Sequence, residues 1–106
     1  MIDSTRGEEG TVGPVLQPTS FGRAVVAAIQ AENSDVAVHD EGAYIRVHTP
    51  RVCRVTKTGV EAQLGQMVNF PGDLEVAMPS FSGLVEMTEA GATWWRASEP
   101  KPEPLT

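Results

Sequence analysis

The stretch Val36-Ala-Val-His-Asp40-Glu-Gly-Ala-Tyr44-Ile-Arg-Val47 decides the fold class, because it has the pattern of a β-hairpin. Apolar and polar residues alternate on either side of a turn that contains Gly42, which is the period expected of two half-buried strands. If Glu41 and Gly42 form a two-residue loop, Val38 lies opposite Ile45. The sequence therefore predicts two antiparallel strands that share one apolar face.

A strand and a helix are predicted before this hairpin. The run Val12-Gly-Pro-Val-Leu16 is apolar and partly β-branched, and because Pro14 has no N–H to donate, the run suits an edge strand. Thr19 or Ser20 is a suitable N-cap for the next segment. Apolar side chains then recur at helical spacing as far as Asn33, which predicts an amphipathic helix of about three turns.

A bent strand and a short helix are predicted after the hairpin. Pro50 marks a bend, and the strand then continues over residues 52–55. Thr58-Gly-Val-Glu61 has the Ser/Thr-x-x-Glu spacing of a capping box, in which hydroxyl and carboxylate satisfy backbone donors at a helix start. Gly65 is suited to the C-terminal end of that helix.

Three further strands complete the expected order. Alternating apolar residues predict a strand over residues 74–78, which a loop over residues 79–83 interrupts. Residues 84–87 and 93–95 flank a turn and predict a final hairpin. The expected fold is α+β, a compact single domain of order β-α-β-β-α-β-β-β with mixed or antiparallel sheets, two short helices and flexible termini.

Composition limits the partners and the compartment. The chain has 106 residues, a net charge of −6 and a pI of about 4.7, so its field repels nucleic-acid phosphates and anionic lipid. The apolar runs are short and interrupted by charge, and the chain begins with acidic residues rather than a signal sequence, so we expect a soluble cytoplasmic protein. Cys53 is the only cysteine, which excludes an internal disulfide and fits a reducing compartment.

Catalytic and metal chemistry find little support in the sequence. In the predicted register His39 and His48 share one hairpin face but lie four rungs apart, roughly 13 Å at the usual strand rise, which is too far for them to share a metal ion. Cys53 has no second cysteine and no visible His–carboxylate arrangement, and is interpreted as an inert strand residue. A well-specified fold without chemistry of its own predicts a protein that acts by docking.

Aromatic residues are the candidate docking anchors. Trp94 and Trp95 are adjacent, so in a regular strand one faces the core and the other faces outward. The outward ring is either a binding anchor, a role in which Trp is enriched, or a cover for the end of the core. Phe81 lies between Pro79 and Gly83, where it either plugs the core or protrudes.

Five motifs, in this order along the chain, together resemble a known family. They are Val12-Gly13-Pro14, Gly42-Ala-Tyr44-Ile-Arg46, Leu64-Gly65 leading to Asn69-Phe70, Leu74-Glu75-Val76, and Ser80-Phe-Ser-Gly83. The set is similar to the effector, or coupling, proteins of bacterial soluble diiron monooxygenases, named for the regulatory components of methane monooxygenase and phenol hydroxylase. The compact length looks more like the members that serve toluene, alkene and propane-type enzymes.

The resemblance implies a cofactor-free regulatory protein with no metal of its own. Such a protein binds the α subunit of a diiron hydroxylase, controls the access of oxygen and substrate, and couples NADH oxidation to hydroxylation or epoxidation. It shares docking territory with the ferredoxin or reductase component. Residues 11–96 would then be the effector domain, preceded by a flexible head over residues 1–10 and followed by a Pro-rich disordered tail over residues 97–106.

The resemblance also implies an interface. Its candidate residues are Thr11, Val12, Gly13, Pro14, Tyr44, Arg46, Met78, Pro79, Ser80, Phe81, Ser82 and Gly83. Two other readings of the sequence stay open. One is a small ligand-binding regulatory domain of ferredoxin-like type, and the other is a small cofactor-free enzyme that uses His39 or His48.

Overall fold

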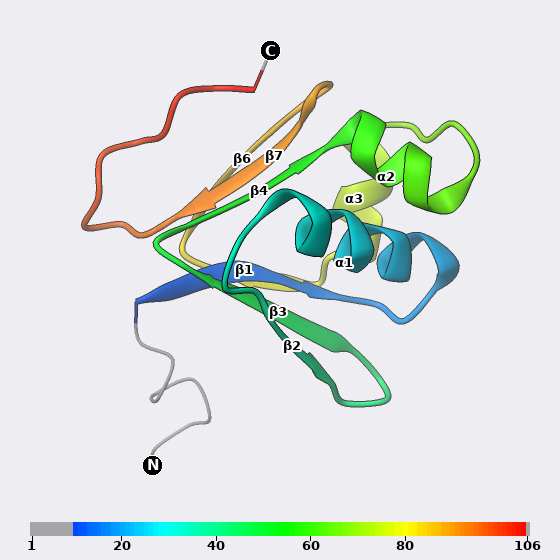
Figure 1. The fold of residues 1–106 in the computed structure, drawn as a ribbon, viewed down its shortest axis with the longest axis horizontal. Coiled ribbons are helices and arrows are strands. Elements are labelled where there is room, and N and C mark those ends of the chain that lie inside the picture. Colours follow the sequence, from blue (N-terminus) through cyan, green and yellow to red (C-terminus); the bar gives the residue numbers. More distant parts are fainter. Residues whose placement is uncertain (1–9, 106) are drawn as a thin grey trace.

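The structure, a computed structural model, describes residues 10–105 and is an α+β fold of three helices and two antiparallel sheets (Figure 1). The elements in chain order are β1 (Thr11–Leu16), α1 (Ser20–Glu32), β2 (Ala37–Asp40), β3 (Ile45–Pro50), β4 (Val52–Thr56), α2 (Lys57–Leu64), α3 (Gly72–Ala77), β5 (Ser80–Ser82), β6 (Leu84–Thr88) and β7 (Gly91–Trp95). The predicted fold class and the final hairpin are confirmed, whereas the helix count is three rather than two.

The strands form a four-stranded sheet of order β2-β3-β1-β5 and a three-stranded sheet of order β4-β7-β6. Two single residues carry the chain from one sheet to the other. Arg51, at φ +67°, joins β3 to β4, and Gly83, at φ +92°, joins β5 to β6. The bend predicted at Pro50 is therefore confirmed, and it is the point at which the chain changes sheets.

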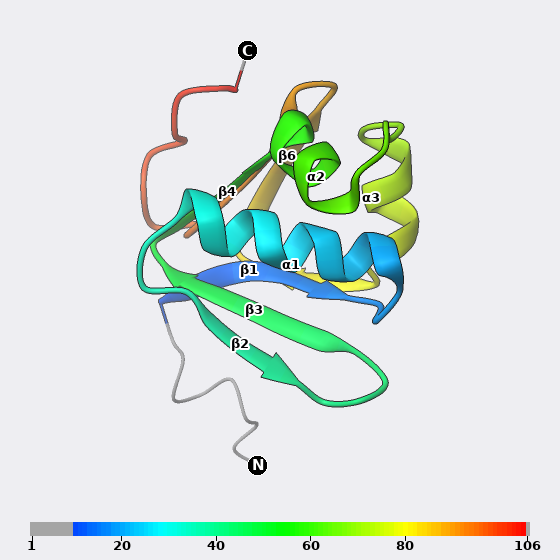
Figure 2. The same ribbon diagram turned by 45° about the vertical axis from the view of Figure 1, so that its right-hand side comes forward.

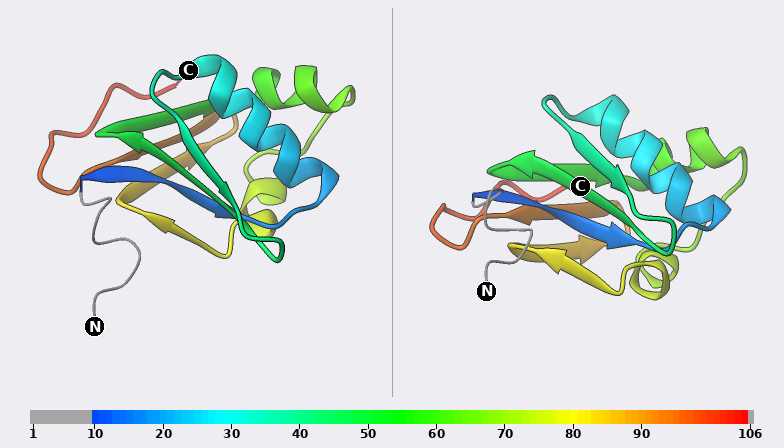
Figure 3. Two further views of the ribbon diagram at one scale, coloured as in Figure 1. Left: turned by 60° about the horizontal axis from the view of Figure 1, so that its bottom comes forward. Right: turned by 90° about the horizontal axis from the view of Figure 1, so that it is seen from below.

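The helices gather on the sheets at one end of the molecule. Helix α1 lies across β1 and contacts both α2 and α3, as Figure 2 shows. Seen from below, α1 and α2 lie together on one side of the sheets, whereas α3 lies beside the start of β5 (Figure 3). The core between these layers is a single apolar cluster whose largest fully buried side chain is Trp94.

The two adjacent tryptophans are both buried. Trp94 is 0% exposed and belongs to the core cluster, while Trp95 is 8% exposed and lies outside that cluster. Of the two interpretations left open for the outward ring, the exposed binding anchor is wrong, because Trp95 is buried. Because Trp95 does not belong to the core cluster, another part of the chain must cover its side chain.

Strand β1 is internal, not the predicted edge strand. It pairs with β3 on one side and with β5 on the other. The register with β3 has pairs at both ends of β1 but none at Gly13 and Pro14, which is how the sheet accommodates a residue without an N–H. Gly13 lies against β3 so closely that a Cβ built there would be 2.2 Å from the Val47 carbonyl oxygen.

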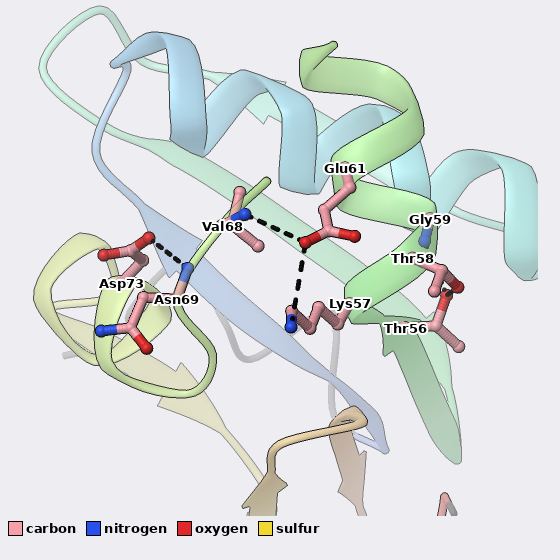
Figure 4. Close-up of polar contacts among 8 residues, drawn as sticks. All are labelled: Thr56, Lys57, Thr58, Gly59, Glu61, Val68, Asn69 and Asp73. Carbon is pink, nitrogen blue, oxygen red and sulfur yellow. Dashed lines mark hydrogen bonds and ion pairs between the residues drawn. The ribbon is translucent and has the colours of Figure 1, made fainter. Parts of the chain in front are cut away.

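Helix α2 begins two residues earlier than the predicted capping box. Its N-cap is Thr56, whose hydroxyl accepts a 3.0 Å hydrogen bond from the Gly59 N–H and donates one of 2.8 Å to Glu32 of α1. Glu61 does not close a box with Thr58, because its carboxylate accepts from the Val68 N–H at 3.0 Å (Figure 4). The predicted C-terminal glycine is confirmed, since Gly65 has φ +82°.

The two threonines can be told apart by substitution. Thr56→Ala removes the cap and the bond to Glu32, so we expect the free energy of unfolding to fall by about 1–2 kcal/mol. Thr58→Ala removes an exposed hydroxyl and its long, 3.4 Å hydrogen bond to the Thr56 hydroxyl, so we expect a change within about 0.5 kcal/mol. Urea denaturation of both variants measures the difference. A larger loss of unfolding free energy from Thr58→Ala than from Thr56→Ala would show that Thr58 is the N-cap, as the sequence predicted.

Residues 72–77 form a helix instead of the predicted strand. Leu74, Ala77 and Met78 are buried at helical spacing, whereas Val76 is 77% exposed. The helix start is fixed locally: Asp73 accepts a 2.8 Å bond from the Asn69 N–H and donates its own N–H to the Asn69 carbonyl (Figure 4). The predicted loop over residues 79–83 was also wrong, because Ser80–Ser82 is strand β5.

The first hairpin is confirmed, but its register is shifted by two residues. Val38 lies opposite Val47 and Asp40 opposite Ile45, so Glu41 to Tyr44 form a four-residue loop. The loop is closed by a hydrogen bond from the Glu41 N–H to the Tyr44 carbonyl and by one from the Gly42 N–H to the Asp40 carboxylate, each 2.9 Å. The latter bond, and then Arg23, lower the pKa of Asp40.

Within the described part of the chain, each helix is too short or too polar to cross a bilayer.

Candidate protein-binding site

Two segments that lie more than thirty residues apart in the sequence line one open hollow of about 620 Å³. The β2–β3 loop and the start of β3 contribute Tyr44 and Arg46, and the chain that leads into and through β5 contributes Pro79 and Phe81. The complete lining is Val15, Gln17, Ala43, Tyr44, Arg46, Pro79, Ser80, Phe81 and Ser82. We call it the Tyr44–Phe81 hollow.

Strand β1 brings the two segments together. Val15 pairs with Arg46 on one side and with Ser80 on the other, so it forms part of the floor between them. The aromatic side chains on the two sides are accessible: Tyr44 is 39% exposed and Phe81 is 43% exposed. Phe81 therefore does not plug the core, and both rings are available to contact another molecule.

The predicted interface residues divide into two groups. Tyr44, Arg46, Pro79, Ser80, Phe81 and Ser82 all line the hollow. The remaining residues do not line it. Val12, Pro14 and Met78 are buried, and Gly13 lies against the backbone of Val47. Val12, Gly13 and Pro14 therefore pack into the sheet as part of β1, and Met78 is buried after α3.

Gly83 has a comparable supporting role at the turn after β5. Its φ of +92° favours glycine, and a Cβ built there would be 2.6 Å from the Trp95 carbonyl oxygen and 2.8 Å from the Val12 side chain. Thr11, which precedes Val12 at the same end of β1, lies 3.5 Å from the imidazole of His48 through its hydroxyl. Thr11 and Gly83 therefore both lie at the N-terminal end of β1 and do not line the hollow.

Sequence reasoning missed a second, more apolar hollow of about 380 Å³ beside the first. Its lining includes Phe21, Leu64 and Val68, together with Met67 and Val76, which are 83% and 77% exposed. Gln17 lines both hollows, and its N–H donates to the Ala77 carbonyl at 2.9 Å. The helical spacing of apolar residues 74, 77 and 78 was the signal that could have predicted an exposed Val76.

The histidines are neighbours, which corrects the predicted 13 Å separation. His39 lies opposite Arg46 and His48 opposite Ala37, so the imidazoles meet diagonally with ring centroids 5.5 Å apart. His48 is buried. Among residues 10–105, no group of three or more His, Cys, Asp or Glu side chains is placed to hold a metal ion.

Cys53 is buried in β4 and belongs to the core cluster. Burial disfavours the thiolate and raises the pKa of Cys53 to about 12, although a hydrogen bond with Thr49 partly opposes that shift. A thiol with this pKa stays protonated at neutral pH and is a poor nucleophile. The predicted position of Cys53 in a strand is confirmed, and its burial keeps the thiol away from solvent.

Two accessible aromatic rings beside an open hollow are features typical of a protein-binding surface. A family model described as MmoB/DmpM family matches residues 10–95. The alkene monooxygenase system effector subunit of Xanthobacter autotrophicus strain Py2 is 33% identical over 93 residues, which cover 86% of this chain and 91% of that protein. The chain belongs to the MmoB/DmpM family and is a regulatory rather than a catalytic component.

Solved structures share the fold. Two chains from structures of phenol hydroxylase–regulatory protein complexes superpose with TM-scores of 0.71 and 0.67, at 19% and 20% sequence identity. Each comparison covers 80% of this chain, and 97% and 99% of the other. The α+β arrangement with two antiparallel sheets is thus the fold of this family.

Proposed function

We propose that this protein is the effector of a multicomponent diiron monooxygenase and that it binds the hydroxylase α subunit through the Tyr44–Phe81 hollow. Family membership supports the first part, together with the 33% identical relative that is named as an alkene monooxygenase effector subunit. The two structures of phenol hydroxylase–regulatory protein complexes support a hydroxylase as the partner. The geometry supports the proposed site, because six of the residues that the resemblance implied line one hollow.

The observation that carries the proposed site is the convergence of two exposed aromatic rings on one concave surface. Tyr44 comes from the β2–β3 loop and Phe81 from strand β5, and they flank a hollow large enough to accept side chains of a partner helix or loop. Aromatic residues that are half-exposed in the free protein and become desolvated on binding are typical interface anchors. Arg46 adds a positive charge to the lining of the same hollow.

The proposed mechanism is differential binding, because a protein without chemistry of its own can change an enzyme only through its conformational equilibrium. The effector shifts the hydroxylase toward the arrangement that it binds more tightly. Each tenfold change in the conformational ratio requires about 1.4 kcal/mol of preference. We propose that this preference controls oxygen and substrate access and couples NADH oxidation to hydroxylation or epoxidation.

The test is a titration of this protein into a matched hydroxylase, reductase and ferredoxin while product and NADH are both measured. We expect product formed per NADH consumed to rise to a maximum near one effector per hydroxylase active site. Excess effector should lower the rate if it shares docking territory with the ferredoxin or reductase. A flat ratio across the titration would contradict the proposed function.

A Tyr44→Ala/Phe81→Ala variant is the matched control in the same assay. Both side chains are half-exposed, so their loss should leave the fold intact while it removes the proposed anchors. We expect this variant to need a much higher concentration to reach the same coupling. Wild-type coupling at the wild-type concentration would show that the protein is an effector whose interface lies elsewhere.

A further inference from the structure

The C-terminal segment after β7 folds back along the β4-β7-β6 sheet, where Figure 1 shows it in orange and red. Residues 97–105 contain no helix or strand, yet side chains attach them at three points. Glu99 pairs with Arg51 at 3.1 Å, and Lys101 pairs with Glu86 at 2.9 Å. Leu105 packs on Gly91, where a built Cβ would be 2.9 Å from the Leu105 Cδ1.

These attachments follow β7 from its last residue back to its first. The Arg51 carbonyl accepts from the Arg96 N–H at the end of β7, Glu86 lies opposite Thr93, and Gly91 is the first residue of β7. The segment therefore runs antiparallel to the strand beneath it. Six residues of polyproline II helix span about 19 Å, and five strand residues span about 17 Å, so the lengths agree.

Burial along the segment repeats every three residues. Glu99, Pro102 and Leu105 are partly buried, whereas Lys101, Glu103 and the other two prolines, at positions 100 and 104, are exposed. Three residues per turn is the period of polyproline II, which forms no internal hydrogen bonds. In the described chain no backbone hydrogen bond joins residues 100–105 to the sheet, so side chains hold the segment in place.

The surface beneath the segment is the face of β7 that points away from the core. Thr93 and Trp95 lie on this outer face, opposite Ala92 and Trp94, yet they are only 4% and 8% exposed. Leu84 lies beside Trp95 in the register. A tryptophan with apolar neighbours on a flat sheet is the type of surface that extended proline-rich segments bind.

We propose that the outer face of the β4-β7-β6 sheet is a binding site for an extended proline-rich segment, and that residues 97–105 of this chain occupy it as a detachable strap. The ligand class is a polyproline II segment with a cation that meets Glu86 and an apolar residue that meets Gly91. Lys101 and Leu105 supply these two groups. The strap lies away from the β2–β3 loop that carries Tyr44, as Figure 1 shows, so this site is separate from the proposed hydroxylase interface.

The first test uses the full-length protein and its own fluorescence, because Trp94 and Trp95 are its two tryptophans. Lys101→Glu places two carboxylates together, so we expect acrylamide quenching of Trp95 to rise. Adding Glu86→Lys reverses the pair, and quenching should return to the wild-type value. Equal quenching in the wild type and in both variants would overturn the proposal.

The second test asks whether the strap binds in trans. A protein that ends at Arg96 should show red-shifted emission and stronger quenching, and a synthetic peptide of residues 97–106 should reverse both changes at one peptide per protein. The same peptide with Lys101→Glu and Leu105→Asp should not. In a Trp95→Phe background, truncation should leave quenching unchanged, because Trp94 faces the core. A folded truncated protein that ignores the peptide at millimolar concentration would also overturn the proposal.

Discussion

Replacement of Phe81 by alanine is expected to weaken hydroxylase binding by about 30-fold, or about 2 kcal/mol, the loss typical of an aromatic interface anchor. Phe81 is 43% exposed and its strand is held by backbone pairing with β1, so the variant should stay folded. Isothermal titration of the effector with hydroxylase measures the change. Unchanged affinity would remove Phe81 from the interface.

Leu84→Ala is the matched control for this measurement. Leu84 is 46% exposed, nearly the same as Phe81, but it lies in the other sheet beside Trp95. We expect its affinity for hydroxylase to equal that of the wild type. Tyr44→Ala, alone and with Phe81→Ala, then completes a double-mutant cycle, in which a non-additive loss would show that both rings contact the same group of the partner.

Replacement of Trp94 by alanine is expected to lower the free energy of unfolding by about 3–5 kcal/mol. Trp94 is 0% exposed and belongs to the core cluster, so the removed ring leaves a cavity in the core beside Cys53 and Val85. Its indole N–H has no hydrogen-bond partner among the described residues, so no polar group is orphaned when the ring is lost. The expected cost is therefore that of lost packing.

Urea denaturation followed by circular dichroism measures the Trp94 effect. Because small domains are stable by only about 5–15 kcal/mol, a loss of this size should lower the denaturation midpoint by a large fraction. Trp94→Phe keeps most of the packing and should retain most of the stability. A Trp94→Ala protein with the wild-type midpoint would show that the core does not depend on this ring.

Residues 74–78 show why short elements were mispredicted. Leu74, Val76 and Met78 alternate as in a strand, but Leu74, Ala77 and Met78 also recur at helical spacing. Five residues are too few to separate the two periods. The choice is made by tertiary contacts and by the Asn69–Asp73 hydrogen bonds at the helix start, which periodicity does not register.

The first hairpin shows what alternation determines and what it leaves open. A register shift of two residues keeps every side chain on its original face, so both the predicted and the observed pairing place Val38 and Val47 together on the apolar side. The same shift changes the distance between His39 and His48 from four rungs to a diagonal contact. Faces were therefore predictable, whereas distances between side chains were not.

The N-cap of α2 was decided by a residue far away in the sequence. Thr56 and Thr58 both offer a hydroxyl close to the helix start, but only Thr56 meets the Glu32 carboxylate, 24 residues earlier in α1. The hollow has the same non-local origin. Residues 44–46 and 79–82 were singled out by family resemblance, and no local pattern could show that β1 would join them.

Because β1 lies between β3 and β5, it fixes the width of the hollow that a partner would meet. Arg46 and Ser80 flank Val15 on neighbouring strands, and adjacent strands lie about 4.8 Å apart, so the two walls of the hollow are held about 10 Å apart by main-chain geometry. Side-chain rotation can tilt the aromatic rings but cannot change this width. We therefore expect the strands of this hollow to keep their spacing on docking, so that larger adjustments fall to the partner.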